Sequence, residues 1–305
     1  MTTRDETVAA YWDHKTNDVF DGPTYWLANP LVAQRHQQLA TRGQNTHWVN
    51  HCVERHLGPA RPVERILTVG CGDGDLERHL ALLDAAVRIE GIDIAPRRVE
   101  IATRRAAEAG LGDRLHYRVA DAEALELEEE AYDAIFFDSS LHHLENLEQA
   151  LESCSRGLKR DGRLFVNEYV GPDRFDLSPE ERRVIEATFS LIPARYRRSH
   201  AEFDRGKVRQ RVAFPDPAEV ARVDPSESIR SSDIPRVLEE RFELIEVNSA
   251  GGTILQFLLD GIAGNFVADD PASVEILEMI FAIEERMLSS GHLRPHFLLA
   301  VCAPR

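Results

Sequence analysis

Three alternating glycines and one aspartate carry the clearest chemical signal in this sequence. Gly70, Gly72 and Gly74 follow a short apolar run, and Asp93 ends the next apolar run, nineteen residues after Gly74. Glycine lets the backbone turn sharply and approach a ligand closely, because there is no Cβ in the way. An aspartate at the end of a neighbouring strand can accept hydrogen bonds from ribose hydroxyls. The four residues therefore predict a nucleoside-binding site.

The spacing and charge of this turn argue against a dinucleotide. A dinucleotide fingerprint would place its third glycine at position 75, which is an aspartate here. Asp73 and Asp75 also put two carboxylates at the start of the following helix, where they would repel a bound pyrophosphate. A ligand with a cationic tail fits better, and S-adenosylmethionine (SAM) carries a sulfonium and an ammonium but no phosphate. We therefore expect SAM and not a nicotinamide cofactor.

Two adjacent histidines, His142 and His143, follow the fourth apolar run. An imidazole titrates in the range where it can remove a hydroxyl proton, so we expect one of them to be a general base, with His143 ahead of His142. The alternative is that one histidine caps the next helix and the other faces solvent. Adjacent side chains point apart and no third ligand stands at a suitable spacing, so the pair predicts no metal site.

Two further segments supply candidate pocket residues. Asn167 and Tyr169 share one face at the end of the fifth apolar run, with Glu168 on the other face. We expect Asn167 and Tyr169 to contact substrate, with Tyr169 also a candidate catalytic residue; an ordinary strand end is the alternative. In the N-terminal segment, Tyr11 and Trp12 combine an aromatic ring with a polar group, so one face can stack while the OH or NH reaches a carboxylate. The alternative for that segment, which also holds His14, is an ordinary docked cap helix.

Strands and helices in alternation must hold these residues. Short apolar runs predict strands at Arg65–Val69 and Tyr132–Phe137. The alternation along the chain predicts further strands at Val87–Ile94, Leu115–Ala120, Arg163–Asn167, Phe242–Val247 and His296–Cys302. Helical patterns lie at Leu76–Leu83, Pro96–Ala109, Asn146–Leu158 and Glu275–Leu288. The fold class is therefore α/β, with a doubly wound, seven-stranded, mostly parallel sheet and helices on both faces.

The chain divides into four expected parts. Residues 1–62 form an N-terminal helical cap or lid, and residues 63–170 form the cofactor-binding core. Residues 171–240, rich in proline, form an insert that builds the substrate pocket after the fifth strand. Residues 241–305 supply the last two strands, with a helical insert after the sixth.

The chain resembles the class I SAM-dependent methyltransferases of the small-molecule type. The resemblance rests on Val69–Gly74, Gly91–Ile94, Val119–Ala122, Phe137–His143 and Leu158–Leu164, which occur in the family's order. It implies that Gly70, Gly72 and Gly74 lie against the methionine portion, with Cys71 as a small filler of the turn. Asp93 would hold the ribose and Ile94 would pack on adenine. Asp121 and Ala122 would lie at the adenine amino group, and Asp138 and Ser139 at the methionine amine. The resemblance also implies an N-terminal lid over SAM, which would bring Tyr11 to the cofactor and Trp12 to the substrate.

Charge and composition restrict the partners. The 305 residues include 36 Lys and Arg against 52 Asp and Glu, a net charge of −16, which repels nucleic acid and anionic membranes. The longest apolar stretches are too short to span a bilayer, and the N-terminus lacks the apolar region of a signal peptide. Four scattered cysteines without a C-x-x-C pair favour a cytoplasmic protein. The oligomeric state is not predicted.

The leading functional hypothesis is a methyltransferase acting on a small metabolite or natural product. Nucleic-acid amine methyltransferases commonly carry an Asn/Asp-Pro-Pro-aromatic run after the fourth strand, whereas this chain has Asp138-Ser139-Ser140-Leu141. One alternative keeps SAM but closes a ring from its own side chain and releases methylthioadenosine. The other alternative is a non-catalytic SAM-binding protein.

Overall fold

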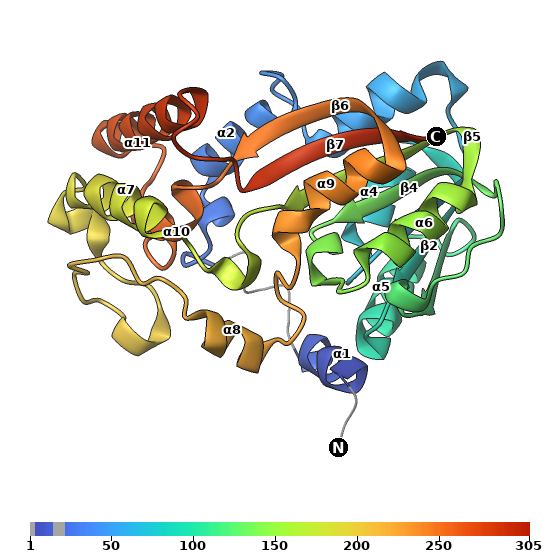
Figure 1. The fold of residues 1–305 in the computed structure, drawn as a ribbon, viewed down its shortest axis with the longest axis horizontal. Helices are drawn as coiled ribbons and strands as arrows, with labels where there is room; N and C mark the ends of the chain where they lie inside the picture. Colours follow the sequence, from blue (N-terminus) through green and yellow to red (C-terminus); the bar gives the residue numbers. More distant parts are fainter. Residues whose placement is uncertain (1–3, 15–21) are drawn as a thin grey trace.

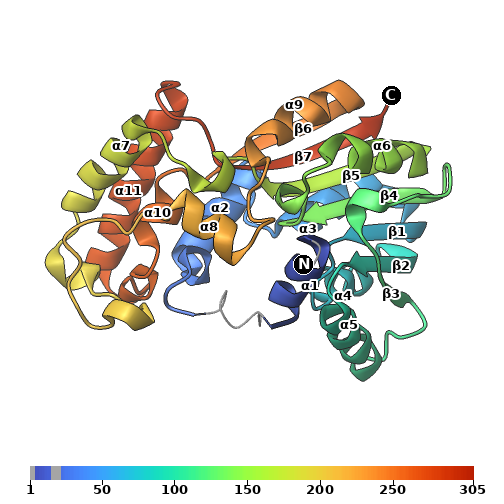
Figure 2. The same cartoon turned by 60° about the horizontal axis from the view of Figure 1, so that its bottom comes forward.

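All seven predicted strands form one sheet. The computed structural model describes residues 4–14 and 22–305 (Figure 1). Its sheet has the order β3-β2-β1-β4-β5-β7-β6, which can be followed in Figure 2. The strands are β1 (Val63–Val69), β2 (Ala86–Asp93), β3 (Leu115–Val119), β4 (Tyr132–Asp138), β5 (Leu158–Tyr169), β6 (Phe242–Gly251) and β7 (Phe297–Pro304). Strands β1 to β5 pair in parallel, and β7 is antiparallel to β5 and β6. This confirms the predicted mostly parallel sheet.

Helices cover both faces of the sheet. On one face, a hydrophobic core joins the strands to α3 (Trp48–Cys52), α4 (Asp75–Leu82) and α5 (Pro96–Glu108). The core of the other face includes α6 (Leu147–Gly157) and α9 (Ile234–Arg241). Strand β4 is apolar throughout its centre because its side chains alternate between these cores: Phe136 belongs to the first and Phe137 to the second.

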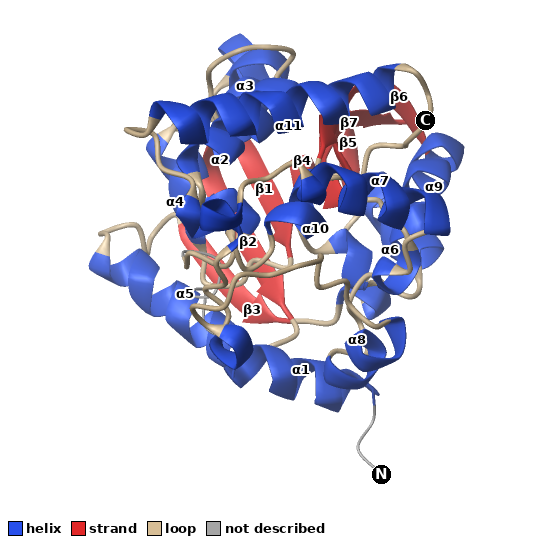
Figure 3. Ribbon diagram, turned by 90° about the vertical axis from the view of Figure 1, so that its left-hand side faces the viewer, coloured by secondary structure: helices blue, strands red, loops and turns tan. Residues whose placement is uncertain are grey.

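A second lobe lies beside the sheet. Its hydrophobic core joins α2 (Pro30–Ala40), α7 (Pro179–Ser190), α10 (Leu255–Leu259) and α11 (Pro271–Ser289). These helices lie together on the left in Figure 1. In Figure 3, which is seen from that side, they lie in front of the sheet. The two inserts predicted after β5 and β6 therefore pack with part of the N-terminal segment into one body.

The predicted N-terminal cap is divided between three places. Helix α2 belongs to the second lobe and α3 packs on the sheet. Helix α1 (Arg4–His14) instead contacts α5, as seen in Figure 2, near the ends of the strands. Of these three helices, α1 is the one that can act as a lid. The short helix α8 (Pro217–Val223) lies in the segment between β5 and β6.

None of the helices in residues 4–14 and 22–305 combines the length and apolar character needed to cross a bilayer. All four cysteines, Cys52, Cys71, Cys154 and Cys302, are buried as free thiols.

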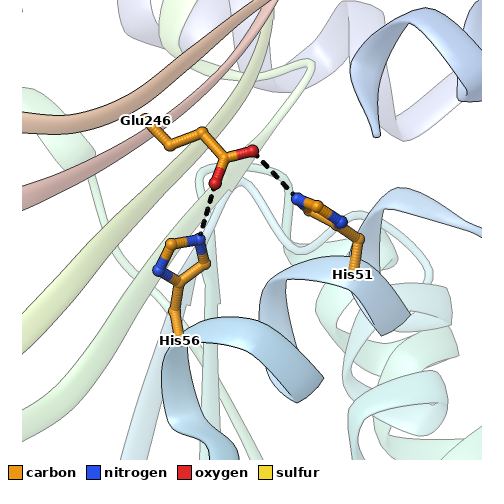
Figure 4. A group of neighbouring side chains, drawn as sticks. All are labelled: His51, His56 and Glu246. Carbon is orange, nitrogen blue, oxygen red and sulfur yellow. Dashed lines mark hydrogen bonds and ion pairs between the residues drawn. The ribbon is translucent and has the colours of Figure 1, made fainter. Parts of the chain in front are cut away.

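A buried carboxylate ties the N-terminal helices to the edge strand of the sheet. Glu246 on β6 lies 3.0 Å from Nε2 of His51 on α3 and 3.2 Å from Nε2 of His56 (Figure 4). Arg42 and Arg55 lie 3.3 and 3.0 Å from the same carboxylate. Because two guanidinium groups already compensate its charge, this His–His–Glu group is a structural ion cluster and a poor metal site.

Replacing Glu246 with glutamine is expected to lower the free energy of unfolding by about 3 kcal/mol at neutral pH. Burial opposes ionisation of Glu246, but Asn248, His51 and Arg42 outweigh it and lower the pKa from 4.5 to about 2; a tenfold change in acidity is worth about 1.4 kcal/mol. This contribution is complete above pH 4.5 and is lost as the pH falls toward 2. Thermal unfolding across that range should show the gap between wild type and variant closing. A gap independent of pH would contradict the ion-cluster account.

Candidate active site

A cavity of about 640 Å³ opens at the carboxyl ends of β1, β2 and β4. It lies where the strand order reverses between β1 and β4, the usual ligand site of such sheets. The lining residues that the sequence singled out are Trp12, Gly70, Cys71, Gly72, Asp93, Ile94, Asp121, Ala122, Asp138, Ser139 and His143. The predicted residues Tyr11, Gly74, His142, Asn167 and Tyr169 do not line it.

The turn after β1 needs glycine for two different reasons. Gly70 has a φ of +75°, and a Cβ there would lie 2.4 Å from the Cβ of Ser140, whose hydroxyl donates to the carbonyl of Val69 at 2.6 Å. Gly72 has a φ of +51°, and no atom of the described chain lies within 4 Å of the place where its Cβ would be. Gly70 therefore permits packing beneath the turn, whereas Gly72 leaves room for a ligand.

Gly74 has a structural position that the sequence did not predict. Its φ is +78°, and a Cβ there would lie 2.7 Å from the hydroxyl oxygen of Tyr117 and 3.0 Å from the Cβ of Ala102. The residue directly precedes α4. Gly74 thus lets the turn pack closely on β3 and α5 instead of facing the cavity.

Asp93 holds the glycine turn in place from the end of β2. Its Oδ2 accepts the backbone N–H of Gly72 and its Oδ1 accepts that of Ala95, both at 2.9 Å. Burial raises the pKa of Asp93, although these bonds oppose the rise. Each carboxylate oxygen can accept more than one hydrogen bond, so Asp93 can keep the turn and still receive two ribose hydroxyls.

The carboxylates at the start of α4 do not form the repulsive pair that the sequence analysis assumed. Asp73 lies 2.7 Å from Nη1 of Arg98 and 3.3 Å from Nη1 of Arg105, both on α5. Asp75 pairs with Arg78 and lies 3.7 Å from Arg105. That argument against a pyrophosphate was therefore wrong, because the sequence does not reveal which cations α5 brings to the turn.

Helix α1 reaches the cavity through Val8 and Trp12. The buried Arg98 donates to the carbonyl of Trp12 at 3.1 Å, and the backbone N–H of Arg97 donates to Asp13 at 2.9 Å. These bonds attach α1 to the start of α5. Arg98 is a cavity residue that sequence reasoning missed.

The predicted lid segment also includes Tyr11 and His14. Tyr11 packs edge-on against Trp12, with ring centroids 5.5 Å apart, and does not line the cavity. The side chain of His14 lies outside the part of the structure that is described.

Asp121 and Asp138 mark two loops that border the cavity. Asp121 accepts the backbone N–H of Glu123 at 2.9 Å, which orders the turn after β3. Asp138 ends β4, and its Oδ1 accepts the amide of Asn167 at 2.8 Å. Burial raises the pKa of Asp138 to about 6, and the charge of Glu168 adds to the rise. Asn167 therefore acts on the cavity through Asp138 instead of lining it.

Glu168 organises the loop after β4, a role the sequence analysis missed. Its carboxylate is fully buried and accepts the backbone N–H groups of Ser140 at 2.6 Å and Leu141 at 2.5 Å. The same carboxylate lies 2.6 Å from Nδ1 of His142. The available signal was an acidic residue between Asn167 and Tyr169 at the end of a strand with an apolar centre, because a buried carboxylate needs partners.

The two histidines lie together, which corrects the expectation that they point apart. Both belong to the short 3₁₀ helix η6 (Leu141–His143), and their ring centroids are 4.2 Å apart. His142 is buried behind the wall between Glu168 and Glu227, the latter 3.6 Å from its Nε2. Burial lowers the pKa of His142, but Glu168 outweighs it, with help from Glu227, so the pKa is raised.

His143 is the histidine that lines the cavity. Its ring lies 5.1 Å, edge-on, from that of Trp12 on α1. Its Nδ1 lies 3.1 Å from the hydroxyl of Ser226, which is 83 residues away in the sequence and also lines the cavity. The segment between β5 and β6 therefore contributes to the site.

Tyr169, predicted as catalytic and substrate-binding, is buried beside the cavity wall. Its hydroxyl donates to the carbonyl of Pro172 at 3.1 Å, and its ring packs edge-on against His142 at 6.3 Å. Burial raises the pKa of Tyr169 well above its ordinary value, so the hydroxyl stays protonated. Its position is one of packing behind His142. Tyr25, which sequence reasoning did not select, does line the cavity.

The expectation of no metal site needs a qualification. His142, His143 and Glu227 each offer one ligand atom, and these atoms lie within 4.8 Å of one another. The third group escaped the sequence analysis because it lies on a distant segment. However, His142 already lies between Glu168 and Glu227, and these carboxylates raise its pKa and so favour the imidazolium, which is not a metal ligand.

The glycine turn, the acid ending β2 and the acid after β3 surround one cavity. This arrangement is typical of the nucleoside-cofactor site in Rossmann-like α/β proteins. A family model described as a methyltransferase domain matches residues 67–166. The chain belongs to the class I SAM-dependent methyltransferases, and SAM is its cofactor.

Individual relatives agree with this assignment. A ubiquinone biosynthesis O-methyltransferase of Methylocella silvestris is 31% identical over 176 residues, 54% of this chain and 67% of that relative. The 27-O-demethylrifamycin SV methyltransferase of Amycolatopsis mediterranei is 30% identical over 135 residues, 44% of this chain and 49% of its own length. The chain thus spans about half to two thirds of these relatives.

Among solved structures, a geranyl diphosphate C-methyltransferase from Streptomyces coelicolor A3(2) superimposes with a TM-score of 0.58. The alignment covers 100% of this chain and 99% of the other, at 14% identity. At that identity the likeness concerns the fold alone.

Proposed function

We propose that this protein transfers the methyl group of SAM to a hydroxyl group of a small metabolite or natural product. The observation that carries the proposal is the position of His143 on the wall of the cavity that also contains the glycine turn and Asp93. A hydroxyl acceptor must lose its proton as it attacks the methyl group, and an imidazole can take that proton near neutral pH. The relatives named for ubiquinone biosynthesis and for a rifamycin act on small molecules, which supports the same class of acceptor.

The cavity suits a cationic donor. Asp93, Asp121 and Asp138 all line it, and the sulfonium and ammonium of SAM are positive. In this proposal Asp93 receives the ribose hydroxyls, Asp121 lies at adenine and Asp138 lies at the methionine amine. The volume of about 640 Å³ lies within the range of small-molecule sites.

Catalysis rests mainly on positioning. Holding the acceptor oxygen in line with the sulfur–methyl bond makes the reaction effectively unimolecular. Trp12 and Val8 on α1 cover part of the cavity and help to exclude water. His143 then accepts the hydroxyl proton while the electron pair of the broken bond passes to sulfur.

We also propose a cytoplasmic location and no nucleic-acid partner. The four buried cysteines are unpaired, which suits a reducing compartment. The net charge of −16 disfavours binding to a phosphate backbone.

The reaction product tests this proposal. Incubating the purified full chain with SAM and a panel of phenols and hydroxylated polyketides should yield S-adenosylhomocysteine and a methylated acceptor in equal amounts, read by mass spectrometry. Methylthioadenosine as the sole nucleoside product would show that the protein closes a ring from the SAM side chain and does not transfer the methyl group. Tight SAM binding without any product across the panel would favour a non-catalytic binding protein.

A further inference from the structure

Asp224 is a buried carboxylate that the proposed reaction has not yet used. Its side chain is 3% exposed, and its Oδ2 has no hydrogen-bond partner within the described residues. Leaving such an oxygen unpaired in a buried place costs free energy. That oxygen lies 3.9 Å from Nδ1 of His143, so Asp224 is placed to stabilise a positive charge that forms on the imidazole.

The hydrogen bonds around Ser226 indicate which ring nitrogen of His143 carries the proton when the imidazole is neutral. The hydroxyl of Ser226 donates to Oδ1 of Asp224 at 2.6 Å, because an ionised carboxylate can only accept. The oxygen of Ser226 must then accept from Nδ1 of His143, 3.1 Å away. The neutral imidazole therefore carries its proton on Nδ1 and has its lone pair on Nε2, the arrangement a general base requires.

We infer that His143, Ser226 and Asp224 form a catalytic relay and that Arg174 is its positioning residue. The inference rests on the proposed function for its substrate, a hydroxyl-bearing small molecule. It extends that function by naming the groups that orient the base and stabilise it once protonated. Arg174, Asp224 and Ser226 lie in the segment between β5 and β6, whereas His143 lies in the loop after β4.

The step balances in atoms and charge. The acceptor oxygen forms a bond to the methyl carbon, and the sulfur–methyl bond breaks with its electron pair going to sulfur. The acceptor O–H bond breaks and an N–H bond forms at Nε2 of His143. The resulting imidazolium keeps its hydrogen bond to Ser226 and is compensated by Asp224 until it releases the proton to solvent, which resets the relay.

Arg174 fixes the loop that carries two of these residues. It lies in the short helix η7 (Asp173–Phe175), with a φ of +55°. Its guanidinium donates to the carbonyls of Pro225 at 2.6 Å, Glu227 at 2.8 Å and Asp224 at 3.3 Å. Its backbone N–H also donates to the carbonyl of Ser228 at 2.8 Å. One side chain thus holds the backbone on both sides of Ser226, and a lysine could not span the same three acceptors.

Other charged groups face His143 and set the background for its titration. His142 lies beside it with ring centroids 4.2 Å apart, and Glu227 belongs to the same group of ligand-type atoms. Trp12, which covers the ring from α1, is uncharged. Because His142 and Glu227 are unchanged in the variants below, shifts between variants report on Asp224 and Ser226.

The first test compares Ser226→Ala and Asp224→Asn with Ser228→Ala, a matched control from the same loop whose hydroxyl donates to Glu227. Both relay variants should lose about 10²-fold in kcat, with SAM affinity unchanged. In Asp224→Asn the acid limb of the pH–rate profile should also move to lower pH, because the lost charge no longer favours the imidazolium. Equal losses in Ser228→Ala, or an unmoved limb with normal rate, would overturn the relay.

A second readout does not depend on turnover. Two-bond ¹H–¹⁵N spectra of the full chain, with the His143 signals identified from a His143→Gln variant, should report the Nδ1-protonated tautomer in wild type and its loss in Ser226→Ala. A wild-type ring protonated on Nε2 would overturn the relay even if the enzyme methylates its acceptor. The expected tautomer without S-adenosylhomocysteine formation would instead count against the proposed function.

Arg174→Lys tests the positioning role. It should reduce kcat about tenfold or more with little change in SAM affinity, and Arg182→Lys serves as a control elsewhere in the same insert. A folded Arg174→Lys variant with the wild-type kcat would show that Arg174 is not a positioning residue of the relay.

Discussion

Replacing His143 with alanine is expected to lower turnover by about 10²–10⁴-fold while SAM affinity changes little. His143 lines the cavity from the loop after β4, whereas the turn expected to hold SAM follows β1. Removing the imidazole therefore removes the acceptor of the hydroxyl proton and leaves the cofactor site in place. Steady-state rates and calorimetric SAM binding on the same preparation measure the two effects separately, and the histidine limb of the pH–rate profile should disappear.

Two other histidine variants make this result specific. His116 is exposed on β3, so His116→Ala should keep the wild-type rate. His142 is buried against Glu168, so His142→Ala should lower thermal stability as well as rate. Near-normal rates in both His143→Ala and His142→Ala would remove the histidine pair from catalysis.

The fold was predictable because its signals are local. Strands β1 and β4 appear as short apolar runs, and β4 is the clearest because both of its faces are buried by helices. The turn at Gly70 was equally visible, since a φ of +75° and the close approach of Ser140 exclude other residues. These signals, the apolar runs and the spacing of the glycines, involve residues that are close together in the sequence.

The acceptor side of the site was not predictable for the opposite reason. Ser226 reaches His143 across 83 residues, from a proline-rich segment in which the sequence predicts only short helical pieces. Arg174 binds three carbonyls of the loop that carries Ser226, and these partners can be recognised only once the loop has folded. Composition identifies this segment as an insert but cannot say which of its side chains enter the cavity.

The local electrostatics of the site could not be predicted from the charges of neighbouring residues in the sequence. Asp73 and Asp75 suggest a repulsive pair, but arginines on α5 and α4 compensate them. Spatial partners, and not sequence neighbours, determine the field at the glycine turn. Adjacent histidines gave the same lesson, since a 3₁₀ turn places His142 and His143 side by side where a strand would separate them.

Asp93→Ala is expected to weaken SAM binding by at least tenfold. Two hydrogen bonds from ribose hydroxyls to a carboxylate are each worth roughly 1.5–3 kcal/mol. The substitution also frees the backbone N–H of Gly72, so the turn that faces the cofactor loses its anchor at the same time. Calorimetric titration with SAM measures the loss, and thermal unfolding establishes that the variant is folded.

Asp93→Asn separates the two contributions of Asp93. Its amide oxygen can still accept one backbone N–H but its nitrogen cannot accept a ribose hydroxyl, so the loss of affinity should be smaller than for alanine. Asp113→Ala, at an exposed position, should bind SAM normally.

Because burial raises the pKa of Asp93, the carboxylate is protonated at a higher pH than an ordinary aspartate, and wild-type affinity for SAM should weaken as the solution is acidified. The asparagine variant should lack that pH dependence. Unchanged SAM affinity in a folded Asp93→Ala variant would exclude Asp93 from the cofactor site.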